Sequence, residues 1–186
     1  MGMNSLADLL EDELKDLYSA ENQLLKALPK MAKKASSEEL KTAFTAHLKE
    51  TERHVKRLQQ IGKILDIDLG GKKCHAMEGL VEEGGEVLDE DGPDAVIDSA
   101  LIGAARRVEH YEMAAYCATR GMAVELGIEE VAALLEETFN EEEAADDKLK
   151  DIAEEEVLPQ AAEAGDKETE DSDETAEETK QTRSRK

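Results

Sequence analysis

Residues 5–34, SLADLLEDELKDLYSAENQLLKALPKMAKK, decide the fold of this chain. Their apolar residues recur at steps of three and four, which is the period of an α-helix with one buried face. The segment therefore predicts a long amphipathic helix. One position on its apolar face breaks the pattern, because Glu21 lies seven residues after Leu14 and seven before Leu28.

The same periodicity marks three further long segments, at about residues 37–65, 92–126 and 128–158, and no stretch alternates as a strand would. Only a tight turn separates the first two predicted helices, and Gly127 breaks the chain between the last two. Helices with such short connections pack antiparallel. We expect an all-α fold with two helical hairpins, the last helix ending at Pro159.

The connection between the hairpins, about residues 66–91, is long and punctuated by glycine, and it contains a short amphipathic piece at residues 76–87. Such a connection can traverse a bundle, as in ferritin-like four-helix folds, whereas an up-down-up-down bundle needs only short loops. We therefore predict a ferritin-like four-helix bundle in residues 1–160. Residues 161–186 hold Glu, Asp, Thr and Ser without a large apolar residue, which predicts a disordered acidic tail.

Acidic side chains outnumber basic ones by 46 to 23 in the 186 residues, a net charge of −23. Most of the excess lies in residues 69–160, with 25 acidic against 7 basic side chains. This surface repels phosphates and anionic lipids, so we expect neither nucleic-acid nor membrane binding. No apolar run approaches a transmembrane length and no signal peptide is recognisable, so we expect a cytoplasmic protein. The acidity is typical of a halophilic surface or of cation binding.

Six polar residues lie on the apolar faces of the four long predicted helices, where a core is expected. An unpaired carboxylate buried there would cost several kcal/mol or take up a proton, so it needs a cation, a partner or water. In so acidic a chain, one glutamate on such a face would mean little. The six residues are Glu21, His47, Glu50, Glu109, Glu112 and Glu142.

Distance from the hairpin turns brings four of these carboxylates to one level. In an antiparallel hairpin, residues equally far from the turn lie side by side, since each residue rises about 1.5 Å. Glu21 and Glu50 are equally far from a turn centred between residues 35 and 36, and Glu112 and Glu142 are equally far from a turn at residue 127. Carboxylates and imidazole around one point suit iron (two ions) or manganese, joined by bridging oxygens.

Motifs in this order along about residues 5–158 carry a family resemblance: Tyr18-Ser-Ala-Glu21-Asn-Gln23, His47-Leu-Lys-Glu50-Thr51, Cys74-His-Ala-Met77-Glu-Gly-Leu80, Glu109-His-Tyr-Glu112, and Glu141-Glu142 with Ala145-Asp146. Together they resemble the YciE/YciF family of bacterial and archaeal ferritin-like proteins. The resemblance implies a ferritin-like four-helix bundle related to rubrerythrins and bacterioferritins. It also implies a homodimer and a stress-associated role.

The wider superfamily holds metal with a first-helix glutamate, a third-helix ExxE and an ExxH on each of the second and fourth helices. The resemblance therefore implies that Glu21 is a terminal ligand and that Glu109 and Glu112 bridge or exchange between ions. On the second helix the order is reversed, since His47 precedes Glu50.

The last long helix departs further from that pattern, because no histidine follows its glutamates. Its ligands are ambiguous, with Glu142 favoured by its position on the apolar face and Asp146 second. His54 also lies on an apolar face, but it either caps the site or sits in the core, and it stays outside the predicted ligands. Three tyrosines either hydrogen-bond a ligand or pack in the core: Tyr18, Tyr111 and Tyr116.

Two functions fit these observations. The first is a carboxylate dimetal protein whose open coordination positions take dioxygen or peroxide, so that it oxidises iron or detoxifies peroxide under stress. No rubredoxin-like Cys-xx-Cys module is present in the sequence, which disfavours a self-contained rubrerythrin-type peroxidase. The second is a non-enzymatic stress protein that keeps a degenerate metal site and works by association. A 24-subunit storage cage is the least favoured.

Overall fold

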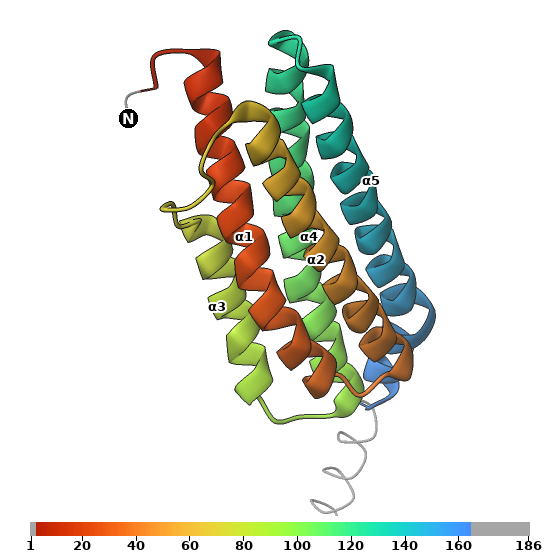
Figure 1. The fold of residues 1–186 in the computed structure, drawn as a ribbon. Helices are drawn as coiled ribbons and strands as arrows, with labels where there is room; N and C mark the ends of the chain where they lie inside the picture. The colour runs from red at the N-terminus through yellow and green to blue at the C-terminus, as the bar shows by residue number, and fades with distance from the viewer. Residues whose placement is uncertain (1–2, 165–186) are drawn as a thin grey trace, which may run out of the picture.

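The computed structural model describes residues 3–164, which form five α-helices and no strand (Figure 1). The all-α prediction is therefore confirmed for these residues. The predicted tail begins with helical backbone at residues 161–164, and the rest of it lies outside the described residues. The elements are α1 (Leu6–Lys34), α2 (Glu38–Leu65), α3 (His75–Asp89), α4 (Asp94–Glu125), α5 (Glu129–Ile152) and the π-helical turn η1 (Ala153–Val157).

Two antiparallel hairpins make up the bundle, α1 with α2 and α4 with α5 (Figure 1). The turn between α1 and α2 is held by Asp98 of α4, whose carboxylate accepts the backbone N–H groups of Ser36 and Ser37 at 2.9 and 2.7 Å. The Ser37 hydroxyl accepts the N–H of Leu40 and caps α2. Gly127 turns the chain between α4 and α5 with a φ of +71°.

The long connection between the hairpins carries α3, which packs against α1 and α4 outside the four long helices (Figure 1). It starts at Asp66, whose backbone is left-handed with a φ of +53°. It enters α3 at Cys74, a buried residue whose thiol accepts the N–H of Met77 as the helix cap. The predicted short helix is thus present, and it covers one side of the bundle.

The apolar core is divided into two clusters, one near each end of the bundle. Leu28, Phe44 and Leu101 belong to the cluster near the α1–α2 turn. Ile61 and Leu135 belong to the cluster near the α4–α5 turn. Buried polar residues of all four long helices lie between the two clusters, and they interrupt the apolar core at mid-height.

The helix predicted to end at Pro159 continues to residue 164, so that prediction is wrong. A proline lacks the N–H of the helical ladder, and its ring clashes with the carbonyl four residues earlier. Here the wider turn η1 directly precedes the proline, and the N–H of Leu158 donates to Ala153, five residues back. The widened ladder accommodates the ring without ending the helix.

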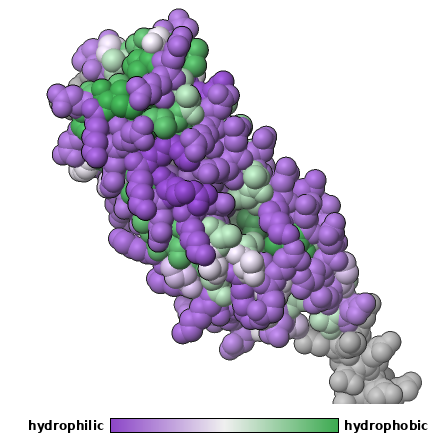
Figure 2. All heavy atoms as spheres, turned by 45° about the vertical axis from the view of Figure 1, so that its right-hand side comes forward, coloured by the Kyte–Doolittle hydropathy of each residue, from purple (hydrophilic) through white to green (hydrophobic). Residues whose placement is uncertain are grey.

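The face of the molecule in Figure 2 is hydrophilic over most of its area, with apolar atoms gathered mainly at its upper end. Exposed apolar side chains at the end of the bundle where α4 meets α5 include Val124 and Leu126. None of the helices in residues 3–164 is long and apolar enough to span a bilayer.

Candidate metal centre

Six ionisable side chains fill the gap between the two apolar clusters, and none is more than 6% exposed. One comes from α1, two from α2, two from α4 and one from α5. Every long helix therefore contributes to a centre that is closed to bulk water. Its members are Glu21, His47, His54, Glu109, Glu112 and Glu142.

These side chains form two groups that share Glu142. The first consists of His47, Glu109, Glu112 and Glu142, and the second of Glu21, His54 and Glu142. Within each group the candidate ligand atoms all lie within 4.8 Å of one another. Two metal–ligand bonds of about 2.1 Å span a little over 4 Å, so small side-chain shifts bring the atoms onto one ion.

Glu142 lies between the two imidazoles and faces one with each oxygen. Its Oε1 is 2.9 Å from Nδ1 of His54, and its Oε2 is 3.6 Å from Nε2 of His47. The two imidazole ring centroids are 6.3 Å apart. A carboxylate placed in this way can bridge two adjacent ions.

The donor atoms of the centre lack the hydrogen bonds that buried polar atoms normally make. Nine buried side-chain atoms within residues 3–164 make no hydrogen bond of good geometry, and all nine belong to the six residues of the centre. Some of them, such as Nδ1 of His54 and Oε1 of Glu142, lie in ion-pair contact with one another. Both oxygens of Glu112 are among the nine atoms. Each such atom costs roughly 1–3 kcal/mol, so oxygen and imidazole donors in this state fit a bound cation.

Charge coupling moves the pKa values of the centre far from their ordinary range. Burial, reinforced by neighbouring carboxylates, raises the pKa of Glu112 well above its ordinary value, and burial does the same at Glu109. Burial opposes the charged imidazoles of His47 and His54, but the carboxylates around them outweigh it and raise both pKa values to about 10. Both imidazoles are therefore protonated in the metal-free centre at neutral pH, and burial favours the protonated form of Glu109 and Glu112.

Each imidazole is also held by a carboxylate on its outer side. Oε2 of Glu141 lies 2.9 Å from Nε2 of His54, which leaves Nδ1 facing Glu142. Oε2 of Glu50 lies 3.5 Å from Nδ1 of His47, on the nitrogen away from Glu142. The guanidinium of Arg53 lies 3.5 Å from Glu50 and 3.3 Å from Glu141, and so links the two outer carboxylates. Such partners fix the ring orientation of metal-binding histidines.

One of the three tyrosines reaches the centre. The hydroxyl of Tyr116 donates to Oε1 of Glu21 at 2.5 Å, inside the bundle. The hydroxyl of Tyr111 instead donates to Asp16, and that of Tyr18 accepts from Gln59. Tyr116 thus orients a candidate ligand.

The structure brings five of the seven predicted ligands together: Glu21, His47, Glu109, Glu112 and Glu142. It does not bring Asp146 into the centre, because the guanidinium of Arg106 binds both of its oxygens, at 2.7 and 3.0 Å. Glu50 lies behind His47 instead of among the inner donors. His54 takes a place that the predicted ligand set left open. A signal for it was present, since it follows His47 by one heptad on the same face of α2.

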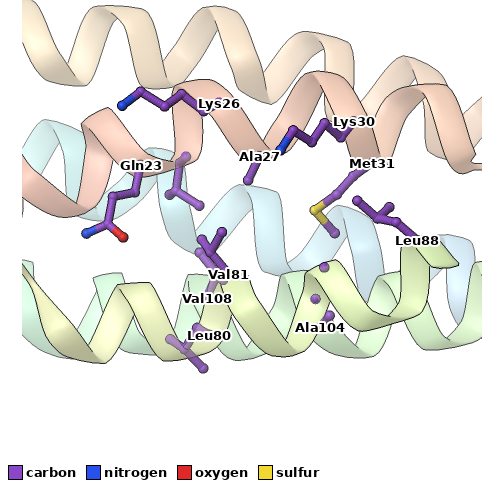
Figure 3. A pocket seen from close by; sticks show the side chains of 13 residues that line it. Gln23, Lys26, Ala27, Lys30, Met31, Leu80, Val81, Leu88, Ala104 and Val108 are labelled. Carbon is purple, nitrogen blue, oxygen red and sulfur yellow. The ribbon is translucent and has the colours of Figure 1, made fainter.

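An apolar cavity of about 270 Å³ lies away from the centre, between α1, α3 and α4 (Figure 3). Met31 of α1 and Leu88 of α3 lie at one end of it, and Lys26 and Lys30 lie along α1. It contains none of the six residues of the centre.

The chain is similar to known proteins over most of its length. Residues 5–163 match the family model described as "Domain of unknown function (DUF892)". Among curated proteins, the chain is 44% identical to Protein YciF of Escherichia coli K12 over 154 residues, which is 82% of this chain and 93% of YciF.

Solved structures share the fold. The E. coli stress protein YciF matches with a TM-score of 0.79 at 44% identity, over 81% of this chain and 96% of that one. YcfI of Rhodopseudomonas palustris matches with a TM-score of 0.77 at 39% identity, over 80% of this chain and 94% of that one. A protein of Xanthomonas campestris matches with a TM-score of 0.68, over 86% of this chain and 98% of that one. At 21% identity, this likeness shows the fold alone.

Proposed function

The chain belongs to the YciE/YciF family, and we propose that it is a stress protein whose bundle binds two metal ions, iron or manganese. The observation that carries the proposal is the set of nine buried donor atoms without hydrogen-bond partners. The description of the E. coli relative as a stress protein supports the physiological setting.

A ferritin-like arrangement is part of this proposal. Two antiparallel hairpins, a long connection that carries α3 and inward carboxylates at mid-height are all typical of that fold. The reversed order of His47 and Glu50 and the absence of a histidine after Glu142 distinguish this chain within the fold. His54 compensates for that absence, because it supplies the second imidazole from α2 instead of α5.

Each inner residue has a definite part in holding the ions. His47, Glu109 and Glu112 would hold one ion, Glu21 and His54 would hold the other, and Glu142, which belongs to both groups, would contribute to both. Four carboxylates balance the charge of two divalent ions, and mixed oxygen and imidazole donors suit iron and manganese. Ions held in this way would supply a redox centre for iron oxidation or for removal of peroxide or dioxygen.

Anaerobic titration with Fe(II) tests the proposal. We expect wild-type protein to bind two equivalents and to unfold at a higher temperature when loaded. Glu112→Leu should lose that thermal gain because a ligand is gone. It should also make the metal-free protein about 1–3 kcal/mol more stable, since two unpartnered buried oxygens are removed.

The matched control is Glu143→Leu, which changes an exposed glutamate one residue after Glu142. It should leave both stoichiometry and metal-induced stabilisation unchanged. No stoichiometric binding by wild-type protein, or equal thermal gain in Glu112→Leu, would contradict a metal site.

A non-enzymatic function by association is the second candidate, as a homodimer or with another protein. Two observations favour it: YcfI is provisionally described as a structural protein, and the apolar cavity lined by Met31 and Leu88 is open on the α1–α3–α4 side. The Fe(II) titration separates the two functions, because association through this side requires no metal at the centre.

A further inference from the structure

A second, smaller cavity of about 80 Å³ reaches the metal centre from the side, between α2 and α5. Three alanines, two large apolar side chains and the stem of a lysine form its wall, and two residues of the centre close its inner end. The lining residues are Ala43, Phe44, Ala46, His47, Glu109, Ala145, Lys148 and Leu149.

The lining runs from the surface to the interior. Ala46 and Lys148 are exposed and Ala145 is half-buried, whereas His47 and Glu109 are only 6% and 2% exposed. The opening exists because alanines stand where two packed helices normally place larger side chains. The cavity is therefore a passage and not an internal void.

The chemistry of the wall selects what can pass. Between the mouth and the inner end the lining is apolar, so an ion would lose its hydration without gaining a partner. The one charge at the mouth, the Lys148 ammonium, is paired with Glu39. A small neutral molecule meets neither obstacle.

We propose that the passage between Ala46 and Ala145 is the route by which a neutral oxidant of the size of dioxygen reaches the metal centre. The inference rests on the proposed function and deepens it by naming the route by which the reactant enters. The route ends at the group that contains His47 and Glu109. Neither Glu21 nor His54 lines it, so the reactant arrives at one ion first.

Nitric oxide is a suitable probe, because it is a neutral diatomic molecule whose binding to Fe(II) is visible in the absorption spectrum. Mixed anaerobically in a stopped-flow instrument with Fe(II)-loaded protein, Ala145→Leu should bind nitric oxide about tenfold more slowly than wild type, because three added carbon atoms fill a narrow apolar passage. Ala46→Leu, at the exposed mouth, should show the same direction. Iron stoichiometry should not change in either variant.

Ala144→Leu is the matched control, since Ala144 is the exposed neighbour of Ala145 on α5 and does not line the passage. It should bind nitric oxide at the wild-type rate. Rates that stay at the wild-type value in both Ala145→Leu and Ala46→Leu would overturn the proposal.

Xenon binding tests the passage in protein that contains no metal. In metal-free wild-type protein under xenon pressure, the methyl resonances of Ala43 and Ala145 should shift, and the Ala43 shift should disappear in Ala145→Leu. Unshifted methyl resonances in wild-type protein would overturn the passage itself. If xenon enters but iron does not bind, the proposed function fails while the apolar passage remains, so the two failures are distinguishable.

Discussion

Protons occupy the metal centre when no metal is bound. His47 and His54 have pKa values raised to about 10, and the pKa values of Glu109 and Glu112 are well above the usual range. At neutral pH both imidazoles are charged, and burial favours the neutral form of these two carboxyl groups. Six ionisable groups can therefore be buried together without a large net charge.

Metal binding should release these protons, so its affinity should depend on pH. All four raised pKa values act in the same direction, because imidazolium and protonated carboxyl groups must lose a proton before they bind metal. Each proton released should tighten Fe(II) or Co(II) binding by about tenfold per pH unit, or by about a hundredfold between pH 6 and pH 8. Calorimetry in buffers of different ionisation enthalpy counts the protons. An apparent enthalpy that is the same in every buffer would contradict this assignment.

At the residue scale, the sequence predicted which inner faces carry acids but not which acids find a partner. Spacing placed both Glu142 and Asp146 on the inner side of one helix. Only the fold could show that Arg106, 40 residues earlier in the chain, binds Asp146 and removes it from the centre. Similarly, His54 was ambiguous because its partner Glu141 belongs to another helix.

At the scale of the element, α3 contains glycines that its own packing does not require. Gly85 is helical, and a Cβ added there would meet no atom within 4 Å. Gly85→Ala should therefore raise the unfolding free energy by about 0.5–1 kcal/mol, because alanine loses less backbone freedom in a helix. Thermal or denaturant unfolding of the metal-free protein measures the change.

The contrasting variant is Gly127→Ala, in the turn between α4 and α5. Its φ of +71° lies in the left-handed region, where a Cβ costs about 1–2 kcal/mol. This variant should be destabilised by that amount. A stability loss in Gly85→Ala would mean instead that another group packs against Gly85 in the apolar cavity that it lines.

The helices themselves were largely predictable, because apolar periodicity is a local property and glycine or a tight turn separates the segments. The predicted segment 76–87 corresponds to α3, His75–Asp89. The prediction that the last helix ends at Pro159 is wrong for a reason that is also local. A proline favours a helix end because it removes one hydrogen bond of the ladder, and at Pro159 the wider turn η1 precedes the ring and the helix continues.

At the scale of the whole molecule, the net charge of −23 acts on the surface and on the centre in different ways. The outer acids remain ionised in water and repel one another. Some are paired, as Glu141 is with Arg57 at 2.8 Å. Others have no ion-pair partner within residues 3–164, and three of them lie exposed on α3: Glu82, Glu83 and Glu86.

Salt should therefore stabilise the metal-free protein. Raising KCl from 0.05 to 1 M shortens the screening length to about 3 Å, so repulsion between unpaired acids is largely removed while the buried centre is little affected. We expect the unfolding free energy to rise by about 1–2 kcal/mol, a substantial part of the stability of a domain. Urea unfolding at each KCl concentration measures this rise.

A variant with Gln in place of Glu82, Glu83 and Glu86 should show a smaller rise in the unfolding free energy, because part of the repulsion is already gone. A fall in stability with KCl would mean that attractive surface pairs outweigh the repulsion, and the acidity of the chain would then need an explanation other than adaptation to salt.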